Sequence, residues 1–246
     1  METQISKATA LLKHSRYTTA FTGAGISVES GIPPFRGETG LWSKYDPIVL
    51  DIGYFHSNSL ESWGVIKEIF YDFFGKAKPN NAHEVLAELE QKGLLKNIIT
   101  QNIDNLHQEA GSKEVYEFHG NSRDLVCTKC GKRFRMQEID FGKLPVTCDV
   151  CGGLIKPDFI FFGEGIPQDA YSNSLDAAES ADVFLVIGTT GEIMPASQIP
   201  IIAKNNGAKI IEINIEPSNY TYQITDVFLK GKATEIMERL SLELNT

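Results

Sequence analysis

The chain has 246 residues, 42% of them hydrophobic and 22% charged, which is typical of a globular protein that forms one domain with an insertion or two domains. Its net charge of −9 argues against nonspecific binding to nucleic acid or anionic membranes, because such binding relies on a cationic surface. Residues 1–15 lack the apolar core of a secretion signal, and no run approaches the roughly twenty apolar residues of a membrane span. We therefore expect a cytoplasmic protein without a membrane or nucleic-acid partner.

The N-terminal region predicts a helix, a strand and a glycine turn. Apolar residues recur at helical spacing over residues 5–12, and residues 17–21 favour a strand that runs into the turn at residues 23–25. Glycines in such a turn let the backbone approach a diphosphate, and free N–H groups at the start of the next helix attract the anion. Val28 stands where a third glycine is expected, and no acidic residue follows a second strand at the usual distance, so an ordinary glycine turn is an alternative.

A loop rich in glycine and proline follows at residues 30–37. Such a stretch cannot continue a helix, so we expect it to cross the mouth of the glycine turn and to carry Phe35 and Arg36. It is either a lid over a cofactor or a plain surface loop. The aromatic-rich residues 40–75 then predict a helical insertion whose rings form a core or line a substrate groove.

Polar side chains follow two further strands at the point where each strand ends. A buried strand predicted at residues 96–99 ends in the polar run 100–104, and one at residues 115–118 ends at His119. Open α/β sheets bind ligands at the carboxyl ends of their strands, so this edge is the best candidate for a reactive centre. The alternative is that the polar run caps a helix and that His119 is a structural histidine.

The helix before this edge is predicted at residues 81–91. Asn80 or Asn81 can cap its start, and Gly93 ends it. His83 lies on this helix, and we expect it to be structural. The histidines that belong to no motif are His14, His56 and His107.

The cysteines form two Cys-x2-Cys pairs, Cys127 with Cys130 and Cys148 with Cys151. Four thiolates on two tight turns can close a tetrahedron around Zn²⁺, and a closed set without a water position is structural. Disulfides are the alternative, which the lack of a secretion signal disfavours. Residues 121–157 hold few other apolar groups, so we expect the metal to supply much of this module's folding free energy.

The C-terminal half predicts more strands, each followed by a turn or a helix. The apolar residues 156–164 are expected to return to the main body as a strand, and small residues at 188–191 and polar residues at 214–216 follow two further strands. These turns suit phosphate or ribose. The repeated order of strand, turn and helix predicts an α/β fold with a mostly parallel, doubly wound sheet. The strands and the last helix are expected at 182–187, 208–213, 227–229 and 234–244.

Taken together, these motifs resemble the sirtuins, the Sir2 family of NAD-dependent protein deacylases, over nearly the whole chain. The matching runs are Gly23-Ala24-Gly25-Ile26-Ser27, Gly31-Ile32-Pro33, Phe35-Arg36, Thr100-Gln101-Asn102-Ile103-Asp104, His119-Gly120, the two cysteine pairs, Phe162-Gly163-Glu164 and Asn214. The resemblance implies a Rossmann-type large domain of residues 1–36, 79–120 and 158–246. The implied small domain joins the helical insertion, residues 37–78, to a four-cysteine zinc ribbon, residues 121–157.

The resemblance also implies that NAD and an acyl-lysine protein or peptide bind between the two domains. The implied catalytic residues are His119, as general base, and Asn102. The implied NAD-binding residues are Gly23, Ala24, Gly25, Val28, Phe35, Arg36, Gln101, Ile103, Asp104, Gly188, Thr189, Thr190, Asn214, Ile215, Glu216 and Ala233. The implied substrate-binding residues are Ile160, Phe161, Phe162 and Gly163, where a peptide would add a strand. The implied metal ligands are Cys127, Cys130, Cys148 and Cys151.

The chemistry that the resemblance implies suits these residue types. Loss of nicotinamide gives the ribose oxocarbenium character, and the amide oxygen of the substrate captures it as an alkylimidate. A base with a pKa near neutrality must then take a proton from a ribose hydroxyl, a task that fits histidine. The implied products are nicotinamide, free lysine and O-acetyl-ADP-ribose.

The chain departs from the family pattern at several positions. Pro34 stands where the family usually has aspartate, and Thr189 where it usually has serine. Tyr71 is followed three residues later by Phe74, so the Tyr-x-x-Arg pair of branches that remove acidic acyl groups is missing. We therefore expect no preference for acidic acyl groups. Two alternatives are ADP-ribosyl transfer on the same scaffold and a non-enzymatic zinc-ribbon adaptor. The local positive charge of Lys129, Lys132, Arg133 and Arg135 favours the adaptor, whereas the net charge of the chain opposes it.

Overall fold

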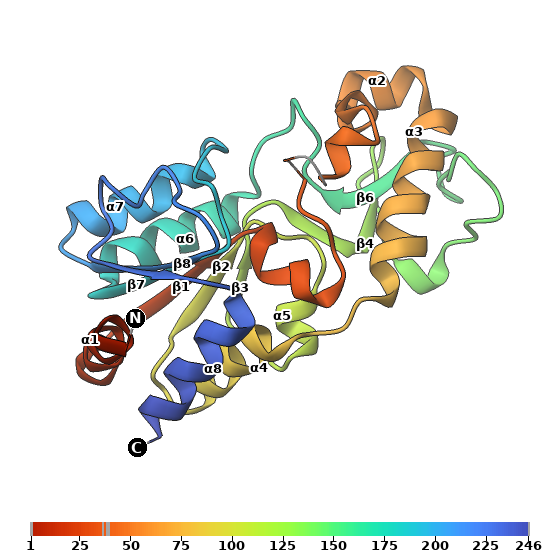
Figure 1. Cartoon of the computed structure of the whole chain (residues 1–246). Helices are drawn as coiled ribbons and strands as arrows, with labels where there is room; N and C mark the ends of the chain where they lie inside the picture. Colours follow the sequence, from red (N-terminus) through yellow and green to blue (C-terminus); the bar gives the residue numbers. More distant parts are fainter. Residues whose placement is uncertain (1, 36, 38–39, 246) are drawn as a thin grey trace.

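The larger of the two sheets among the described residues is parallel and lies at the left in Figure 1, apart from β4, β6, α2 and α3 at the right. The computed structural model describes residues 2–35, 37 and 40–245, and within them this sheet has six strands in the order β3-β2-β1-β7-β8-β9. Every neighbouring pair is parallel. The predicted doubly wound sheet is therefore confirmed. Its strands are β1 (Thr18–Thr22), β2 (Asn97–Thr100), β3 (Val115–Glu117), β7 (Val183–Ile187), β8 (Lys209–Asn214) and β9 (Val227–Lys230).

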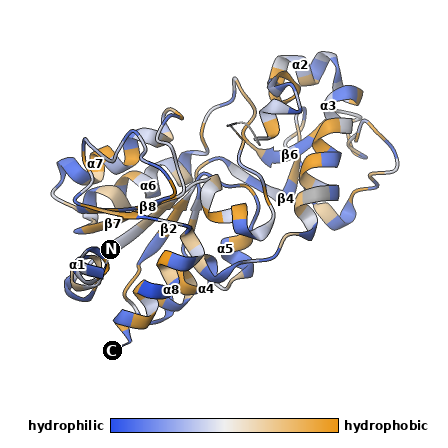
Figure 2. Ribbon diagram, viewed as in Figure 1, coloured by the Kyte–Doolittle hydropathy of each residue, from blue (hydrophilic) through white to orange (hydrophobic). Residues whose placement is uncertain are grey.

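Helices cover both faces of this sheet. Side chains alternate between the faces along each strand, so Ala20 and Leu185 pack on one side, whereas Phe21 and Phe184 pack on the other. Burial on both faces explains why the strands read as unbroken apolar runs. One face is covered by α1 (Glu2–His14), α4 (Asn81–Gln91) and α8 (Ala233–Leu244), the other by α6 (Gln168–Ser180) and α7 (Ile199–Asn205). Figure 2 shows hydrophobic and hydrophilic residues mixed along α4 and α8, as expected for helices with one buried side.

The ends of α4 agree with the prediction. The side chain of Asn80 accepts a hydrogen bond from the N–H of Ala82, and the ring of His83 accepts one from the N–H of Asn80. Gly93, at φ +72°, follows the end of the helix. The helix predicted after the first glycine turn differs, because residues Ala24–Ser30 form a 3₁₀ helix, η1, instead of an α-helix.

The second sheet is antiparallel, with the order β5-β4-β6, and carries the cysteines. Its strands are β4 (Gly120–Cys127), β5 (Arg133–Arg135) and β6 (Ile155–Phe159). The strand predicted at residues 156–164 is present as β6, but only over Ile155–Phe159, and where it was expected to return to the main body it does not join the parallel sheet. β6 pairs with β4, so the segment that enters the cysteine module and the segment that leaves it lie side by side. Helices pack beside it (Figure 1). These are α2 (Ile52–Ser57), α3 (Ser59–Ile66) and the π-helix η4 (Lys67–Phe73).

The cysteine module and the helical insertion share one apolar cluster. Leu125, Val146 and Ile155 of the module are buried against Phe55 and Trp63 of the insertion. The indole N–H of Trp63 also donates to the carbonyl oxygen of Ile155 at 2.9 Å. We expected the module to have almost no apolar core. This expectation is corrected, because the apolar residues of the module pack with those of the helical insertion.

The remaining elements are short. They are η2 (Leu41–Ser43), η3 (Pro47–Leu50), η5 (Phe74–Lys76), α5 (Leu106–Glu109), η6 (Met136–Glu138) and η7 (Ala196–Gln198). Among the described residues, no helix has both the length and the apolar character that crossing a bilayer requires.

Candidate active site

Two glycine turns touch where the strand order reverses, between β1 and β7. The N–H of Gly25 donates to the carbonyl oxygen of Gly188 at 2.8 Å. A Cβ on Gly25 would lie 2.6 Å from the Gly188 Cα, and Gly188 itself has φ +65°, so both positions require glycine. A strand-order reversal of this kind is where doubly wound sheets bind nucleotides.

The polar run after β2 is hydrogen-bonded to both turns. Asn102 Nδ2 donates to the Gly23 carbonyl oxygen and to Ser27 Oγ, each at 3.2 Å. Gln101 Nε2 donates to Thr189 Oγ1 at 3.0 Å. These segments lie far apart in the chain but meet at one edge of the sheet.

Ile103 and Asp104 are held rigidly beside Asn102. Ser27 Oγ donates to Asp104 Oδ2 at 2.7 Å, and the carbonyl oxygen of Ile103 accepts a hydrogen bond from Ser122 Oγ, also at 2.7 Å. Burial raises the pKa of the Asp104 carboxyl. The chain turns away at Asn105, whose φ of +64° lies in the left-handed region that asparagine tolerates.

His119 follows β3 and faces the same edge. Its Nδ1 lies 3.1 Å from the carbonyl oxygen of Gln101. A carbonyl can only accept, so Nδ1 carries the proton, and the neutral ring keeps its lone pair on Nε2. Burial lowers the pKa of His119, so the ring is neutral near pH 7. Gly120, at φ +75°, is required here because a Cβ would lie 2.2 Å from the carbonyl oxygen of Asp158.

Two buried histidines, His83 and His107, lie behind these residues, and His107 belongs to no motif in the sequence. Their ring centroids are 4.9 Å apart. His107 Nε2 lies 2.9 Å from Thr22 Oγ1, which in turn donates to Thr100 Oγ1 at 2.8 Å. Thr100 Oγ1 accepts from the N–H of Asn102 at 3.1 Å. The signal that could have found His107 is its position directly after the polar run.

His83 reaches the site from the other side. Its Nε2 lies 3.4 Å from Ser27 Oγ, and its Nδ1 belongs to the cap of α4. Burial lowers the pKa of His83 to about 4 and that of His107 well below its ordinary value. The expectation that His83 has a structural role agrees with these contacts.

The residues expected at the adenosine half lie farther along the same edge, after β7 and β8. Asn214 Nδ2 donates to the Thr189 carbonyl oxygen at 2.9 Å. Ile215 is exposed, and Glu216 forms a 2.9 Å ion pair with Lys230. The other expected contacts are placed as follows: Thr190 and Val28 are exposed, Ala24 is half-buried, and Ala233 is buried at the start of α8.

The structure describes most of the expected lid, the loop of residues 30–37. The ring of Phe35 packs against Trp42 at 5.5 Å, and the carbonyl oxygen of Pro34 accepts from the N–H of Leu41 at 2.9 Å. Proline does not disturb this contact, which uses only its carbonyl. Arg36 lies outside the described residues.

The loop of residues 160–163 lies next to His119. The N–H of Ile160 donates to the His119 carbonyl oxygen at 2.9 Å, that of Phe161 to Glu164 Oε2 at 2.8 Å, and that of Phe162 to the Leu50 carbonyl oxygen at 2.8 Å. Phe161 is fully buried, whereas Phe162 is 51% exposed. These three N–H groups are already used, and the carbonyl oxygens of Phe161 and Phe162 already accept from the N–H groups of Glu164 and Ile52. A paired peptide is therefore expected at the carbonyl oxygen of Ile160 or at the backbone from Gly163 onward.

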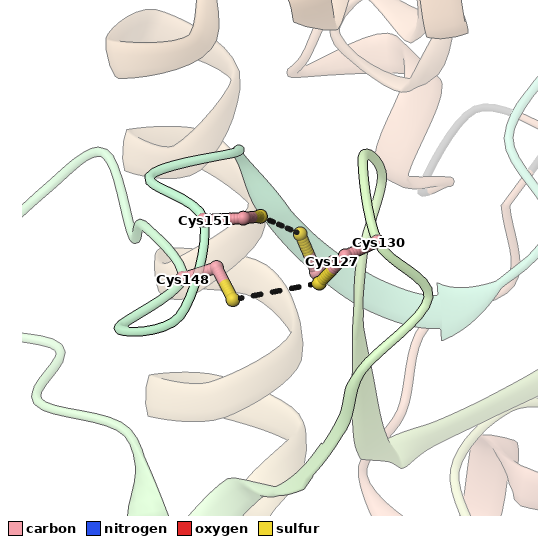
Figure 3. A group of neighbouring side chains, drawn as sticks. All are labelled: Cys127, Cys130, Cys148 and Cys151. Carbon is pink, nitrogen blue, oxygen red and sulfur yellow. Dashed lines mark hydrogen bonds between the residues drawn. The ribbon is translucent and has the colours of Figure 1, made fainter.

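The four cysteines converge on one point (Figure 3). The Sγ atoms of Cys127 and Cys151 are 3.5 Å apart, those of Cys130 and Cys148 are 3.8 Å apart, and all four lie within 4.8 Å of one another. Zn–S bonds of about 2.3 Å in a tetrahedron place sulfur atoms about 3.8 Å apart. The residues present therefore fit a closed zinc site with four thiolate ligands.

Three cations of the cysteine module are paired with acids. Lys132 Nζ lies 2.8 Å from Asp149, Arg135 lies 2.6 Å from Asp124, and Arg133 pairs with Asp158. These pairs lower the local positive charge on which the adaptor alternative depends, whereas Lys129 has no ion pair among the described residues.

Comparison with known proteins gives one family. The sequence model of the Sir2 family matches residues 23–195. An NAD-dependent protein deacylase of Thermococcus sibiricus is 45% identical over 248 residues, covering 98% of this chain and 96% of the relative. NAD-dependent protein deacetylase 1 of Pyrobaculum aerophilum is 42% identical over 239 residues, covering 96% and 93%.

Solved structures agree. A mutant Sir2 homologue bound to ADP-ribose superposes with a TM-score of 0.92 at 40% identity, covering 97% of this chain and 96% of the other. More than half of the chain matches the family, and the predicted fold and resemblance are confirmed. This chain belongs to the Sir2 family.

Proposed function

We propose that this protein is an NAD-dependent protein-lysine deacetylase that releases nicotinamide, free lysine and O-acetyl-ADP-ribose. The observation that carries the proposal is the hydrogen bond from His119 Nδ1 to the Gln101 carbonyl oxygen, 3.1 Å long. It leaves Nε2 as a free base at the edge where the glycine turns meet. Relatives with 41–45% identity are named NAD-dependent protein deacetylases or deacylases, which supports the same reading.

The residues of this edge suit the parts of NAD in order. We assign the adenosine half to Asn214 and the turn at residues 188–190, a ribose to Gln101, and the nicotinamide pocket to residues 102–104. NAD would supply the ribosyl group that takes the acyl group. We assign the diphosphate to the turns that contain Gly25 and Gly188, because they lie at the strand-order reversal, where doubly wound sheets bind nucleotides. Val28, Phe35, Arg36, Ile215, Glu216 and Ala233 remain expected contacts.

His119 and Asn102 have different tasks in this proposal. His119 Nε2 takes the proton from a ribose hydroxyl, because burial keeps the ring neutral and ready to accept. Asn102 is fixed by its side-chain bonds to Gly23 and Ser27, so it can orient the group bound in the nicotinamide pocket without reorganising first.

The substrate and the metal complete the proposal. We infer that an acyl-lysine peptide lies against Ile160, Phe162 and Gly163, whereas the expected contact with the side chain of Phe161 is dropped because that side chain is fully buried. A Sir2 protein bound to a p53 peptide and NAD⁺, 37% identical with a TM-score of 0.89, supports this class of partner. We assign the four cysteines to a structural zinc ion. Reduced thiolates of this kind suit the cytoplasm, and we infer that location.

The first experiment incubates the purified protein with an acetyl-lysine peptide, with and without NAD⁺, and follows peptide mass and nicotinamide together. Loss of the acetyl group matched by nicotinamide release, and abolished in His119→Ala, is the expected result. Nicotinamide release with the acetyl group retained would point to ADP-ribosyl transfer. No turnover of either co-substrate would contradict an enzymatic role.

A further inference from the structure

A buried lysine lies beneath the loop of residues 160–163. Lys156 is on β6 with only 5% of its surface exposed, and its ammonium group reaches into the turn that follows the strand. Burial lowers the pKa of this lysine, as expected for a charge removed from water. A charge buried at this depth needs full compensation.

The compensation is complete and comes from residues on either side of the loop, two on β6 and one directly after residue 163. Lys156 Nζ donates to the carbonyl oxygens of Pro157 and Phe159, each at 2.8 Å, and lies 3.1 Å from Glu164 Oε2. An ammonium group has three N–H donors, and three acceptors are present. The Nζ also lies 4.5 Å from the centroid of the Phe161 ring.

Glu164 links Lys156 to the backbone of the loop. Its Oε2, already paired with Lys156, accepts from the N–H of Phe161 at 2.8 Å, and its own N–H donates to the Phe161 carbonyl oxygen at 3.0 Å. Phe161 is thereby held on both sides. Its neighbour Ile160 is bonded to the backbone of His119, the proposed base.

We propose that Lys156 is a positioning residue that fixes the loop of residues 160–163 for the acyl-lysine peptide by binding two carbonyl oxygens and Glu164. This inference rests on the proposed function, which places the peptide on that loop. The arrangement suits a positioning role because the ammonium group of Lys156 contacts two carbonyl oxygens, the Glu164 carboxylate and the Phe161 ring, all of which belong to or flank the loop. Its ammonium group has no donor left for a substrate.

The test uses Lys156→Met, Glu164→Gln and the double variant. Lys156→Met alone leaves the Glu164 carboxylate without its cation and is expected to destabilise the protein. The double variant removes that unpaired charge, so it recovers stability while the carbonyl oxygens of Pro157 and Phe159 stay untethered. Lys143→Met is the control, because Lys143 forms an exposed ion pair on the same module, its side chain 88% exposed.

In the double variant we expect the KM for the acetyl-lysine peptide to rise roughly tenfold, while the KM for NAD stays within about twofold of the unsubstituted protein. Amide hydrogen exchange over residues 159–164 should become faster in the same variant and stay unchanged in Lys143→Met. A folded double variant with unchanged peptide KM and unchanged exchange would overturn the proposal. Equal rises of both KM values would also overturn it.

Hydrogen exchange separates this inference from the proposed function. If the unsubstituted protein deacetylates no peptide, the proposed function fails, and exchange over residues 159–164 alone decides whether Lys156 holds the loop.

Discussion

His119 and Gln101 are joined through one hydrogen bond, 3.1 Å from the ring Nδ1 to the main-chain oxygen, and this bond selects the tautomer of the proposed base. Nε2 is left without a proton as long as the ring is neutral. Burial lowers the pKa of His119, because a charged imidazolium loses its hydration there.

We therefore predict that kcat/KM for deacetylation rises with pH through an apparent pKa below 6.5 and levels off above it. The sign follows from the role, since a base must be unprotonated to accept. Rates measured from about pH 5 to 8 would check this, and a midpoint above about 7 would contradict it.

Replacing His119 by alanine should lower kcat by about 10²- to 10⁴-fold with little effect on unfolding by urea.

The buried pair His83 and His107 predicts loss of stability in acid. Both rings stay neutral in the folded protein but take up protons near pH 6.5 once unfolded. Stability is therefore fully present above pH 6.5 and falls as the pH decreases toward 4, by about 3 kcal/mol for His83 alone. Urea unfolding at about pH 7 and about pH 4.5 measures the decrease.

His83→Gln should reduce that decrease, whereas His14→Gln, at an exposed position, should leave it as it is. The carboxylates that titrate in the same range are common to all the variants. Equal pH dependence in the two variants would show that His83 does not supply the effect.

The contact between the glycine turns predicts that Gly25→Ala costs about 2 kcal/mol and weakens NAD binding, because the new Cβ would lie 2.6 Å from the Gly188 Cα. The matched control is Gly64→Ala in α3, where nothing lies within 4 Å of the new Cβ. Helix propensity makes that change neutral to stabilising by up to about 1 kcal/mol. Thermal unfolding and NAD titration distinguish the two.

Removal of zinc is predicted to loosen the cysteine module without unfolding the parallel sheet. Metal analysis should find one zinc ion per chain. A chelator, or Cys151→Ser, should speed hydrogen exchange in residues 121–157 and leave β1 and β7 protected, because the two regions belong to different apolar clusters. Val150→Ala, exposed between two ligands, is the control. Uniform unfolding of the whole chain would contradict this separation.

The acyl specificity follows from Tyr71 and Phe74. The Tyr71 hydroxyl is buried without a hydrogen-bond partner among the described residues, and its ring lies 4.6 Å from Phe141. Phe74 is buried in the same apolar cluster. No cation stands in the arginine position of the acid-binding pair, so desuccinylation should be slower than deacetylation on matched peptides. Desuccinylation exceeding deacetylation would refute this.

Local patterns were sufficient for the parallel sheet and for the cysteine site. Strands buried on both faces leave continuous apolar runs, and paired cysteines on two tight turns are the usual ligands of a structural zinc ion, so neither needs knowledge of distant contacts. The polar run after β2 was recognisable because it ends a buried strand.

Contacts between residues far apart in the chain could not be predicted in this way. The placement of β6 beside β4, and the packing of Trp63 on Ile155, depend on residues that meet only after folding. The contacts of His107 could not be predicted for the same reason, because this histidine lies on α5 and its partner Thr22 lies on β1. No motif in the sequence singles out Lys156, and its burial is seen only in the structure.

His119 contributes to the site with both its side chain and its backbone. Its ring supplies the proposed base, and its carbonyl oxygen anchors Ile160. We therefore expect this loop to tolerate a change of residue type better than a change of length. Insertions or deletions between residues 158 and 164 would displace the base together with the loop, whereas a new side chain at the exposed Phe162 alters the surface offered to a peptide and leaves the backbone where it is. New substrate preferences in this chain should thus arise by substitution at such outward positions.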